Sequence, residues 1–226
     1  ASFSLRQTGV ALDANMNFKD GTKSMFYNLI RTPNLNKDLL KAIPSEAVAL
    51  IGLTLGGADS AQAQAVGAKI QEATGLDLGS QIFGNIEQIT IFAVPPKEAV
   101  APAGAGVPPI GQALGVAITS RNPQQTQQLL TSVLQMANLV APEAQIAPPA
   151  TGRYEIPLAV GMKLFGFTSE ADRRMVLSLN PQLVEESVAS AQADKSVLRG
   201  GALQDALATL PPTTSKLLAV NVAGAL

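Results

Sequence analysis

The sequence predicts an α+β fold, with a mostly antiparallel sheet and helices on one of its faces. Several segments alternate apolar and polar residues, which is typical of strands with one face in solvent. Others carry apolar residues three and four positions apart, which is typical of amphipathic helices. Between residues 47 and 158 these segments follow one another as strand, helix, strand, strand, helix, strand. This β-α-β-β-α-β succession is the split βαβ order of ferredoxin-like proteins, and a hairpin and two helices follow it.

The N-terminal residues predict a hairpin and then helices. Residues 2–18 alternate in polarity on either side of Gln7-Thr8-Gly9, which favours a turn. A helical segment from about 23 to 31 comes next. A short helix then ends at Ile43, because Pro44 cannot continue a helix and extends the residue before it.

The middle of the chain supplies most of the predicted sheet. Apolar, β-branched segments predict four strands, at residues 47–55, 88–94, 113–120 and 152–158. A helix from about 58 to 74 separates the first two. Asn122-Pro123 begins another helix, because asparagine caps a helix N-terminus and proline is tolerated in its first turn.

The C-terminal elements repeat signals seen earlier in the chain. A hairpin with strands at 162–168 and 174–179 precedes Asn180-Pro181, a second Asn-Pro helix start. A further helix, 203–210, stops at Pro211-Pro212 before the last strand, 216–222.

Two regions are expected. Residues 1–44 form a hairpin and helices that either complete a sheet or end a preceding repeat unit. Residues 45–226 form an α+β unit, whose loop at 95–111 is rich in Pro, Ala and Gly and therefore favours extended backbone. The pattern leaves open whether the two regions pack as one compact body.

The two ends of the chain show the same succession of a hairpin, a helical segment, a helix that ends at a proline, and a strand. The prolines are Pro44 near the start of the chain and Pro211 near its end. Recurrence of a whole succession at long range predicts an internal repeat. We therefore interpret each proline as a structural joint that delivers the chain from a helix into a strand.

Three segments together resemble an uncharacterised bacterial family, the domain-of-unknown-function family 3352. They are LLKAIPSEAVALIGL, TGLDLGSQIFGNIEQITIFAVP and LSLNPQLVEESVASAQADKSVLRGGALQDALATLP. The resemblance implies an extracytoplasmic protein, in the periplasm or at the cell surface, in which such units recur. It implies no catalytic residues. The chain begins at Ala1 without a leader, so we expect either a removed signal peptide or a segment of a longer protein.

The composition argues against several classes of function. A net charge of −1 gives no basic surface for nucleic acid, and the longest apolar run is shorter than the ~20 residues of a membrane-spanning helix. The chain has no cysteine and no histidine, which removes the commonest general base and most zinc sites. We expect a protein that is not an enzyme and has no cofactor or metal. Its expected partners are other protein subunits or envelope components, with self-association included.

Few residues qualify as candidates for a site. Phe165 and Phe167 alternate along one strand and so share a face, which Tyr154 is expected to join. Core packing is the simpler interpretation. The alternative is an apolar ligand, such as a lipid, carried between the sheet and its helices. Gly56 and Gly57 precede a predicted helix and form a weak candidate for anion binding, for which a tight turn is the simpler explanation.

Charged residues offer no clear catalytic arrangement. Glu185 and Glu186 are adjacent on a predicted helix and therefore point in different directions, which does not suit an acid–base pair. The charges between Glu170 and Arg174 occupy a predicted hairpin turn, where solvated charge is the expected condition.

Overall fold

The computed structural model describes most of the sheet and the helices packed on it. The described residues are 2–6, 9–13, 33–55, 68, 71–72, 84–95, 109–128, 131, 152–159, 162–169 and 173–221, with backbone alone for 2–6, 9–13, 109–110 and 159. The predicted helix at 23–31, most of the helix at 58–74 and most of the loop at 95–111 lie outside these residues.

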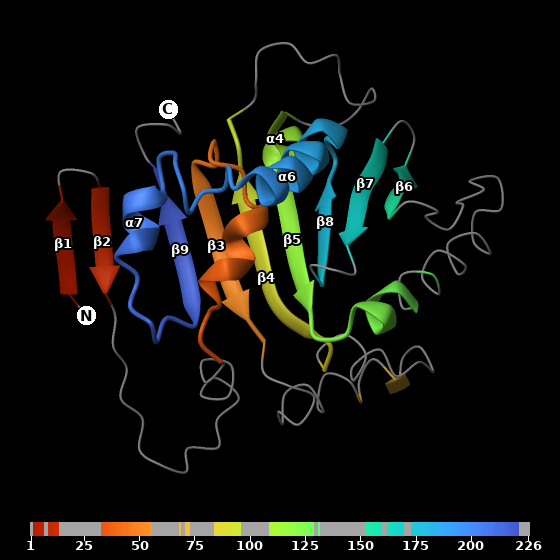
Figure 1. The fold of residues 1–226 in the computed structure, drawn as a ribbon, viewed down its shortest axis with the longest axis horizontal. Coiled ribbons are helices and arrows are strands. Elements are labelled where there is room, and N and C mark those ends of the chain that lie inside the picture. Colours follow the sequence, from red (N-terminus) through yellow and green to blue (C-terminus); the bar gives the residue numbers. More distant parts are fainter. Residues whose placement is uncertain are drawn as a thin grey trace.

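The predicted α+β class is confirmed, because one sheet of seven antiparallel strands carries helices (Figure 1). The strand order across the sheet is β6-β7-β8-β5-β4-β3-β9, and every neighbouring pair is antiparallel. The strands are β3 (Ala49–Thr54), β4 (Ile86–Ala93), β5 (Leu114–Ser120), β6 (Arg153–Ala159), β7 (Met162–Ser169), β8 (Arg174–Ser178) and β9 (Lys216–Val220).

The ferredoxin-like strand order is not confirmed. In a split βαβ arrangement a third strand separates the first two, whereas β3 and β4 pair directly here. The register aligns Leu50 with Phe92 and Phe92 with Gly115, so buried positions of three successive strands share one face. A slip of one residue would turn this buried set towards the other face, which fixes the register.

The N-terminal hairpin is also present in the structure. It consists of β1 (Ser2–Arg6) and β2 (Gly9–Asp13), which pair antiparallel with Phe3 opposite Leu12. These two strands form a separate two-stranded sheet and are not hydrogen-bonded to the seven-stranded one.

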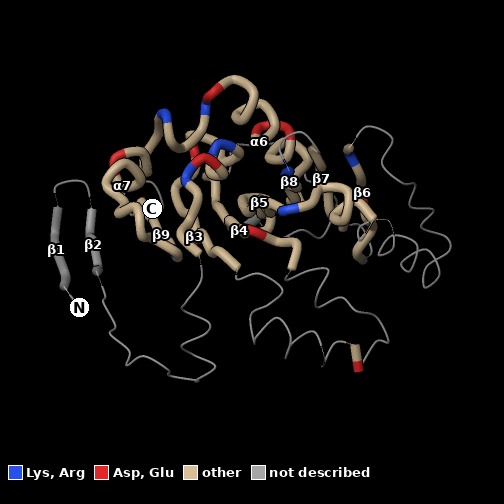
Figure 2. The backbone as a smooth tube through the Cα atoms, turned by 60° about the horizontal axis from the view of Figure 1, so that its bottom comes forward, with Lys and Arg blue, Asp and Glu red and all other residues tan. Residues whose placement is uncertain are grey.

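Three helical elements lie over one face of the large sheet (Figures 1 and 2). They are the 3-10 helix η1 (Lys37–Ala42) and the α-helices α6 (Pro181–Ala193) and α7 (Gln204–Ala208). A short helix, α4 (Pro109–Ala113), leads directly into β5. Leu40 of η1, Leu183 of α6 and Leu207 of α7 belong to the same buried cluster as Leu50 and Phe92.

The predicted helix starts are explained by capping. The side chain of Asn180 accepts a hydrogen bond from the backbone N–H of Gln182 at 3.0 Å, and Pro181 opens α6. Asn122 does the same for a helix that begins at Pro123, accepting from the N–H of Gln125 at 3.2 Å.

The segment that precedes β3 belongs to the same core as the C-terminal elements. Ile43 is completely buried, and its carbonyl accepts a hydrogen bond from the N–H of Val197 at 2.9 Å. Pro44 forms a β-bridge with Ser196. Residues 33–44 therefore pack with the C-terminal part of the described chain and do not form a body of their own.

One arginine ties together strand ends that the sequence does not mark as close. The guanidinium of Arg121 donates to the carbonyls of Gly84 and Ile86 at 3.0 and 2.7 Å, and to that of Leu55 at 3.0 Å. Five fixed donors make arginine suited to several carbonyls at once. Arg121 thus joins the ends of β3, β4 and β5.

Gly201 is a position where only glycine fits. Its φ is +86°, and an added Cβ would overlap the backbone carbonyl of Ser45, whereas a Cβ on neighbouring Gly200 would meet nothing within 4 Å. We expect Gly201→Ala to lower the free energy of unfolding by about 2 kcal/mol. The matched variant Gly200→Ala should change it by less than about 0.5 kcal/mol. Urea unfolding measures both, and equal effects would contradict the assignment.

Candidate interaction surface

The two faces of the large sheet differ in what covers them. Leu50, Phe92 and Val176 point towards the helices and are buried. The residues between them point to the opposite face, because side chains alternate along a strand. That second face is also apolar but only partly buried, and its apolar members include Ile51, Leu53, Ile89, Ile91, Leu114, Val116, Ile118, Met175, Leu177, Leu218 and Val220.

Exposure on this face is greatest towards β9. Leu218 is 71% exposed, Val220 50%, Ile51 40% and Leu114 38%. These residues lie close together because Ile51 pairs with Leu218, while Ala49 and Ala93 continue the row from Val220 to Leu114. We name Ile51, Leu114, Leu218 and Val220 the apolar patch. Contiguous exposed apolar residues of this kind mark surfaces that bind other proteins or membranes.

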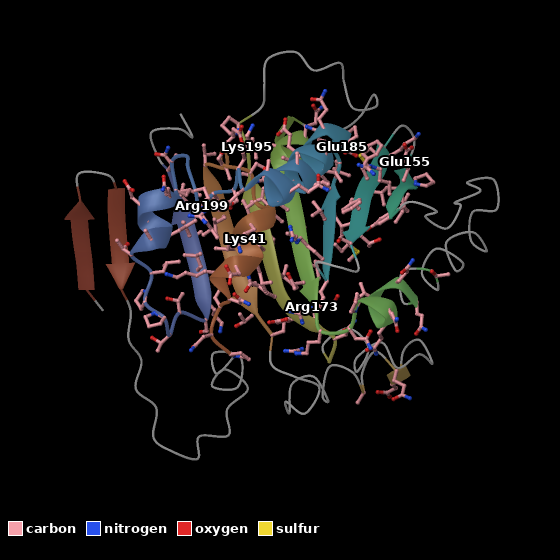
Figure 3. The ribbon with its side chains drawn as sticks, viewed as in Figure 1. Lys41, Glu155, Arg173, Glu185, Lys195 and Arg199 are labelled. Atoms are coloured by element: carbon pink, nitrogen blue, oxygen red, sulfur yellow. The ribbon has the colours of Figure 1, made fainter. Side chains whose placement is uncertain are left out.

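Most of the charged positions lie on the helical side of the sheet. Lys41, Lys195 and Arg199 project from the helical layer in Figure 3, and Figure 2 shows the same layer carrying most of the charged positions near α6 and α7. Lys216 is an exception, because it pairs with Leu53 and so lies on the same face as the patch, two residues before Leu218. The other neighbours of the patch are apolar strand residues, so covering the patch would cost little charge solvation apart from that of Lys216.

The best-formed ion pair lies at the other end of the sheet. Arg153 Nε and Nη2 donate to the two carboxylate oxygens of Glu185 at 2.7 and 2.8 Å, and both side chains are about half exposed. Hydrogen bonding from Arg153 lowers the pKa of Glu185 below its ordinary value. Half-exposed pairs of this kind contribute little to stability. The ion pair of Glu185 with Arg153 therefore connects α6 to β6 at the surface.

The structure brings together two of the three aromatic candidates. Phe165 and Phe167 lie opposite Ser178 and Val176 of β8, which places both on the helical face, as their alternation predicts. Tyr154 lies opposite Gly166 and therefore occupies the other face. Its ring covers Gly166 so closely that a Cβ there would overlap it. Phe165, Phe167 and Tyr154 do not form one cluster.

The space beside Phe167 is small. A cavity of about 50 Å³ lies between the sheet and α6, lined in part by Phe167, Val176 and Val188. Pockets that hold organic ligands usually measure about 300–1,000 Å³. At this position the structure offers no room for a lipid chain.

The remaining candidates give no assembled chemistry. Gly56 and Gly57 lie outside the described residues, as do residues 170–172 of the charged turn. Arg173, at the end of that turn, lies 3.5 Å from a carboxylate oxygen of Glu87. Among the described residues, no group of three or more Asp or Glu side chains is placed to hold a metal. None of the helices that the structure describes is long and apolar enough to cross a membrane.

The patch is not recognisable as a site from the sequence. Its members were recognisable only as apolar strand positions, which are buried in most sheets. The pairing of β9 with β3 brings Leu218 beside Ile51 from the opposite end of the described chain, and no local signal indicates that pairing.

Comparisons of the chain with protein-family models, with curated proteins and with solved structures gave no match. The geometry of the described residues is therefore the basis for the function proposed below.

The hydroxyl of Tyr154 is buried and has no hydrogen-bond partner in the described part of the chain. Burial raises the pKa of this phenol above its ordinary value, so it stays neutral. We expect Tyr154→Phe to raise the free energy of unfolding by about 1 kcal/mol, because it removes an unsatisfied polar group and keeps the ring. Tyr154→Leu, which loses the ring over Gly166, should lower it. Urea unfolding that shows Tyr154→Phe to be clearly destabilised would contradict this interpretation.

Proposed function

We propose that this protein is a non-enzymatic scaffold of the bacterial cell envelope, whose units associate through the apolar patch. The observation that carries the proposal is the exposure of Leu218, Val220, Ile51 and Leu114 on one contiguous part of the sheet. Removing an apolar surface of this kind from water lowers the free energy by roughly 25 cal/mol per Å² of apolar area.

The proposed partner is a second copy of the same chain. A net charge of −1 on 226 residues produces little repulsion between copies. Leu218 and Val220 of the patch lie on β9, the strand that ends the seven-stranded sheet, whereas Ile51 and Leu114 lie on β3 and β5. Two identical patches are self-complementary when they meet across a two-fold axis.

The extracytoplasmic location and the membership in domain-of-unknown-function family 3352 are part of the proposal. They are supported by the segments around Pro44 and Pro211 and by TGLDLGSQIFGNI between them, which resemble that family. A chain without cysteine is compatible with an oxidising compartment, since it carries no thiol to oxidise.

The residue composition and the pairing of Glu185 support the proposal of a non-enzymatic role. The chain contains no histidine, and the carboxylate of Glu185 is engaged by Arg153 in a surface ion pair. The buried hydroxyl of Thr54 is occupied by the backbone, since its single O–H lies within hydrogen-bond distance of the carbonyls of Pro33 at 2.6 Å and Ser215 at 3.0 Å.

Self-association is the measurement that tests this function. Size-exclusion chromatography with light scattering should show the mass rising from 23.3 kDa towards twice that value as the concentration increases. The double variant Leu218→Lys/Val220→Lys should weaken association at least tenfold, because two ammonium groups would have to be desolvated in the contact.

Leu158 provides the matched control. It is 52% exposed and apolar, but it lies on β6 at the opposite end of the sheet. Leu158→Lys should leave association unchanged. A wild-type chain that stays monomeric at all concentrations, or an equal loss in the Leu158 variant, would contradict the proposal.

A further inference from the structure

Two parts of the structure are related by one constant shift in sequence. A helical segment, a proline and a strand each recur at the offset that separates Pro44 from Pro211. The pairs are the starts of η1 and α7 at Lys37 and Gln204, the joints Pro44 and Pro211, and the starts of β3 and β9 at Ala49 and Lys216. Equal spacing of three features indicates that these two parts are copies of one unit.

The pairing of β3 with β9 obeys the same shift. Ile51 lies opposite Leu218, which is its own counterpart in the other copy. Leu50 lies opposite Ala219, and Gly52 opposite Leu217, so exchanging the copies converts one pair into the other. A local two-fold axis therefore passes between β3 and β9 at Ile51 and Leu218.

Backbone hydrogen bonds around the axis occur in matching pairs. Ile43 N–H to Leu40 C=O at 3.0 Å matches Leu210 to Leu207 at 3.4 Å; Ala47 to Pro44 at 3.1 Å matches Thr214 to Pro211 at 3.2 Å; Asn221 to Val48 at 2.7 Å matches Thr54 to Ser215 at 3.4 Å. The symmetry thus extends from the strands into both proline joints.

The two copies differ in their neighbours. β3 pairs with β9 on one edge and with β4 on the other, both antiparallel, whereas β9 ends the seven-stranded sheet. Because Asn221 donates to Val48, antiparallel geometry directs the N–H and C=O groups of Leu217 and Ala219 towards β3. Those of Leu218 and Val220 point to the outer edge.

The outer edge of β9 has few of the features that keep edge strands from pairing. Its sequence, KLLAV, contains no proline, and its register with β3 has no bulge. Its one charge, Lys216, lies at the start of the strand. Edges that do not pair usually carry charge, proline or a bulge in the middle of the strand.

We propose that the outer edge of β9 pairs antiparallel with β9 of a second copy, which joins two seven-stranded sheets into one. This inference rests on the proposed function and specifies its contact. A two-fold axis perpendicular to the sheet makes the two β9 strands antiparallel, which is also how β3 meets β4. Side chains of Leu218 and Val220 from both copies then lie side by side on the apolar face.

Hydrogen exchange of individual amides tests the pairing directly. When the concentration is raised through the association range, exchange of the Leu218 and Val220 amides should slow at least tenfold. Amides of Leu217 and Ala219, which are bonded to β3, should be protected throughout and serve as the internal reference. Protection of Leu218 and Val220 that does not change with concentration would mean that the same chain covers this edge, for example with the hairpin β1–β2, and would overturn the inference.

A proline substitution distinguishes pairing through the outer edge of β9 from contact through the apolar face. Val220→Pro removes an outward N–H without removing a bond to β3, and proline is tolerated on edge strands. It should weaken association at least tenfold, whereas the matched variant Val220→Ala, which keeps the N–H, should weaken it less. Far-ultraviolet circular dichroism verifies that both variants fold. If Val220→Pro does not fold, the hydrogen-exchange measurement on the wild-type chain tests the edge pairing.

The outcomes distinguish this inference from the proposed function. If the lysine variants abolish association while Val220→Pro associates normally and the edge amides stay unprotected, copies meet face to face and the edge pairing is wrong. If the wild-type chain does not associate at all, the proposed function fails, and the edge pairing fails with it.

Discussion

The burial of Ile43 at the joint before Pro44 is the interaction on which the rest of the fold depends. Pro44 ends the helical segment and forces extended backbone, while Ile43 enters the core completely. The Ile43 carbonyl and Pro44 then contact Val197 and Ser196, which are distant in sequence. The joint therefore fixes the first described helical segment against the C-terminal part of the chain and sets the position from which β3 enters the sheet.

The second joint depends on the first. Lys37, at the start of η1, donates from its ammonium group to the carbonyl of Leu207 in the last turn of α7 at 3.3 Å and to that of Leu210, just after the helix, at 2.9 Å. A cation at the end of a helix satisfies carbonyls that have no partner within the helix. The Lys37 ammonium group thus connects the two joints beside the paired strands β3 and β9.

Buried polar residues contribute to the same arrangement and do not form a separate site. Gln88 is almost fully buried; its Oε1 accepts from the N–H of Asn36 at 3.2 Å and its Nε2 donates to Thr90 at 3.4 Å. These bonds hold the segment before η1 against β4. With one face of the sheet filled in this way, the opposite face and the β9 edge carry the exposed apolar surface from which we infer association.

The sequence by itself determined the local elements of this protein. Proline at 44 and 211, asparagine before Pro123 and Pro181, and alternation in KLFGFTS set helix ends, helix starts and the shared face of Phe165 and Phe167, because each acts within a few residues.

Only the tertiary structure decided which strands are neighbours. It placed β4 beside β3, set Tyr154 on the face opposite Phe167, and brought Leu218 next to Ile51. Strand pairing joins segments that are distant in sequence, and several pairings satisfy the same alternation of apolar and polar residues. Which apolar residues stay exposed follows from that choice, so the interaction surface was visible only once the strands had been placed.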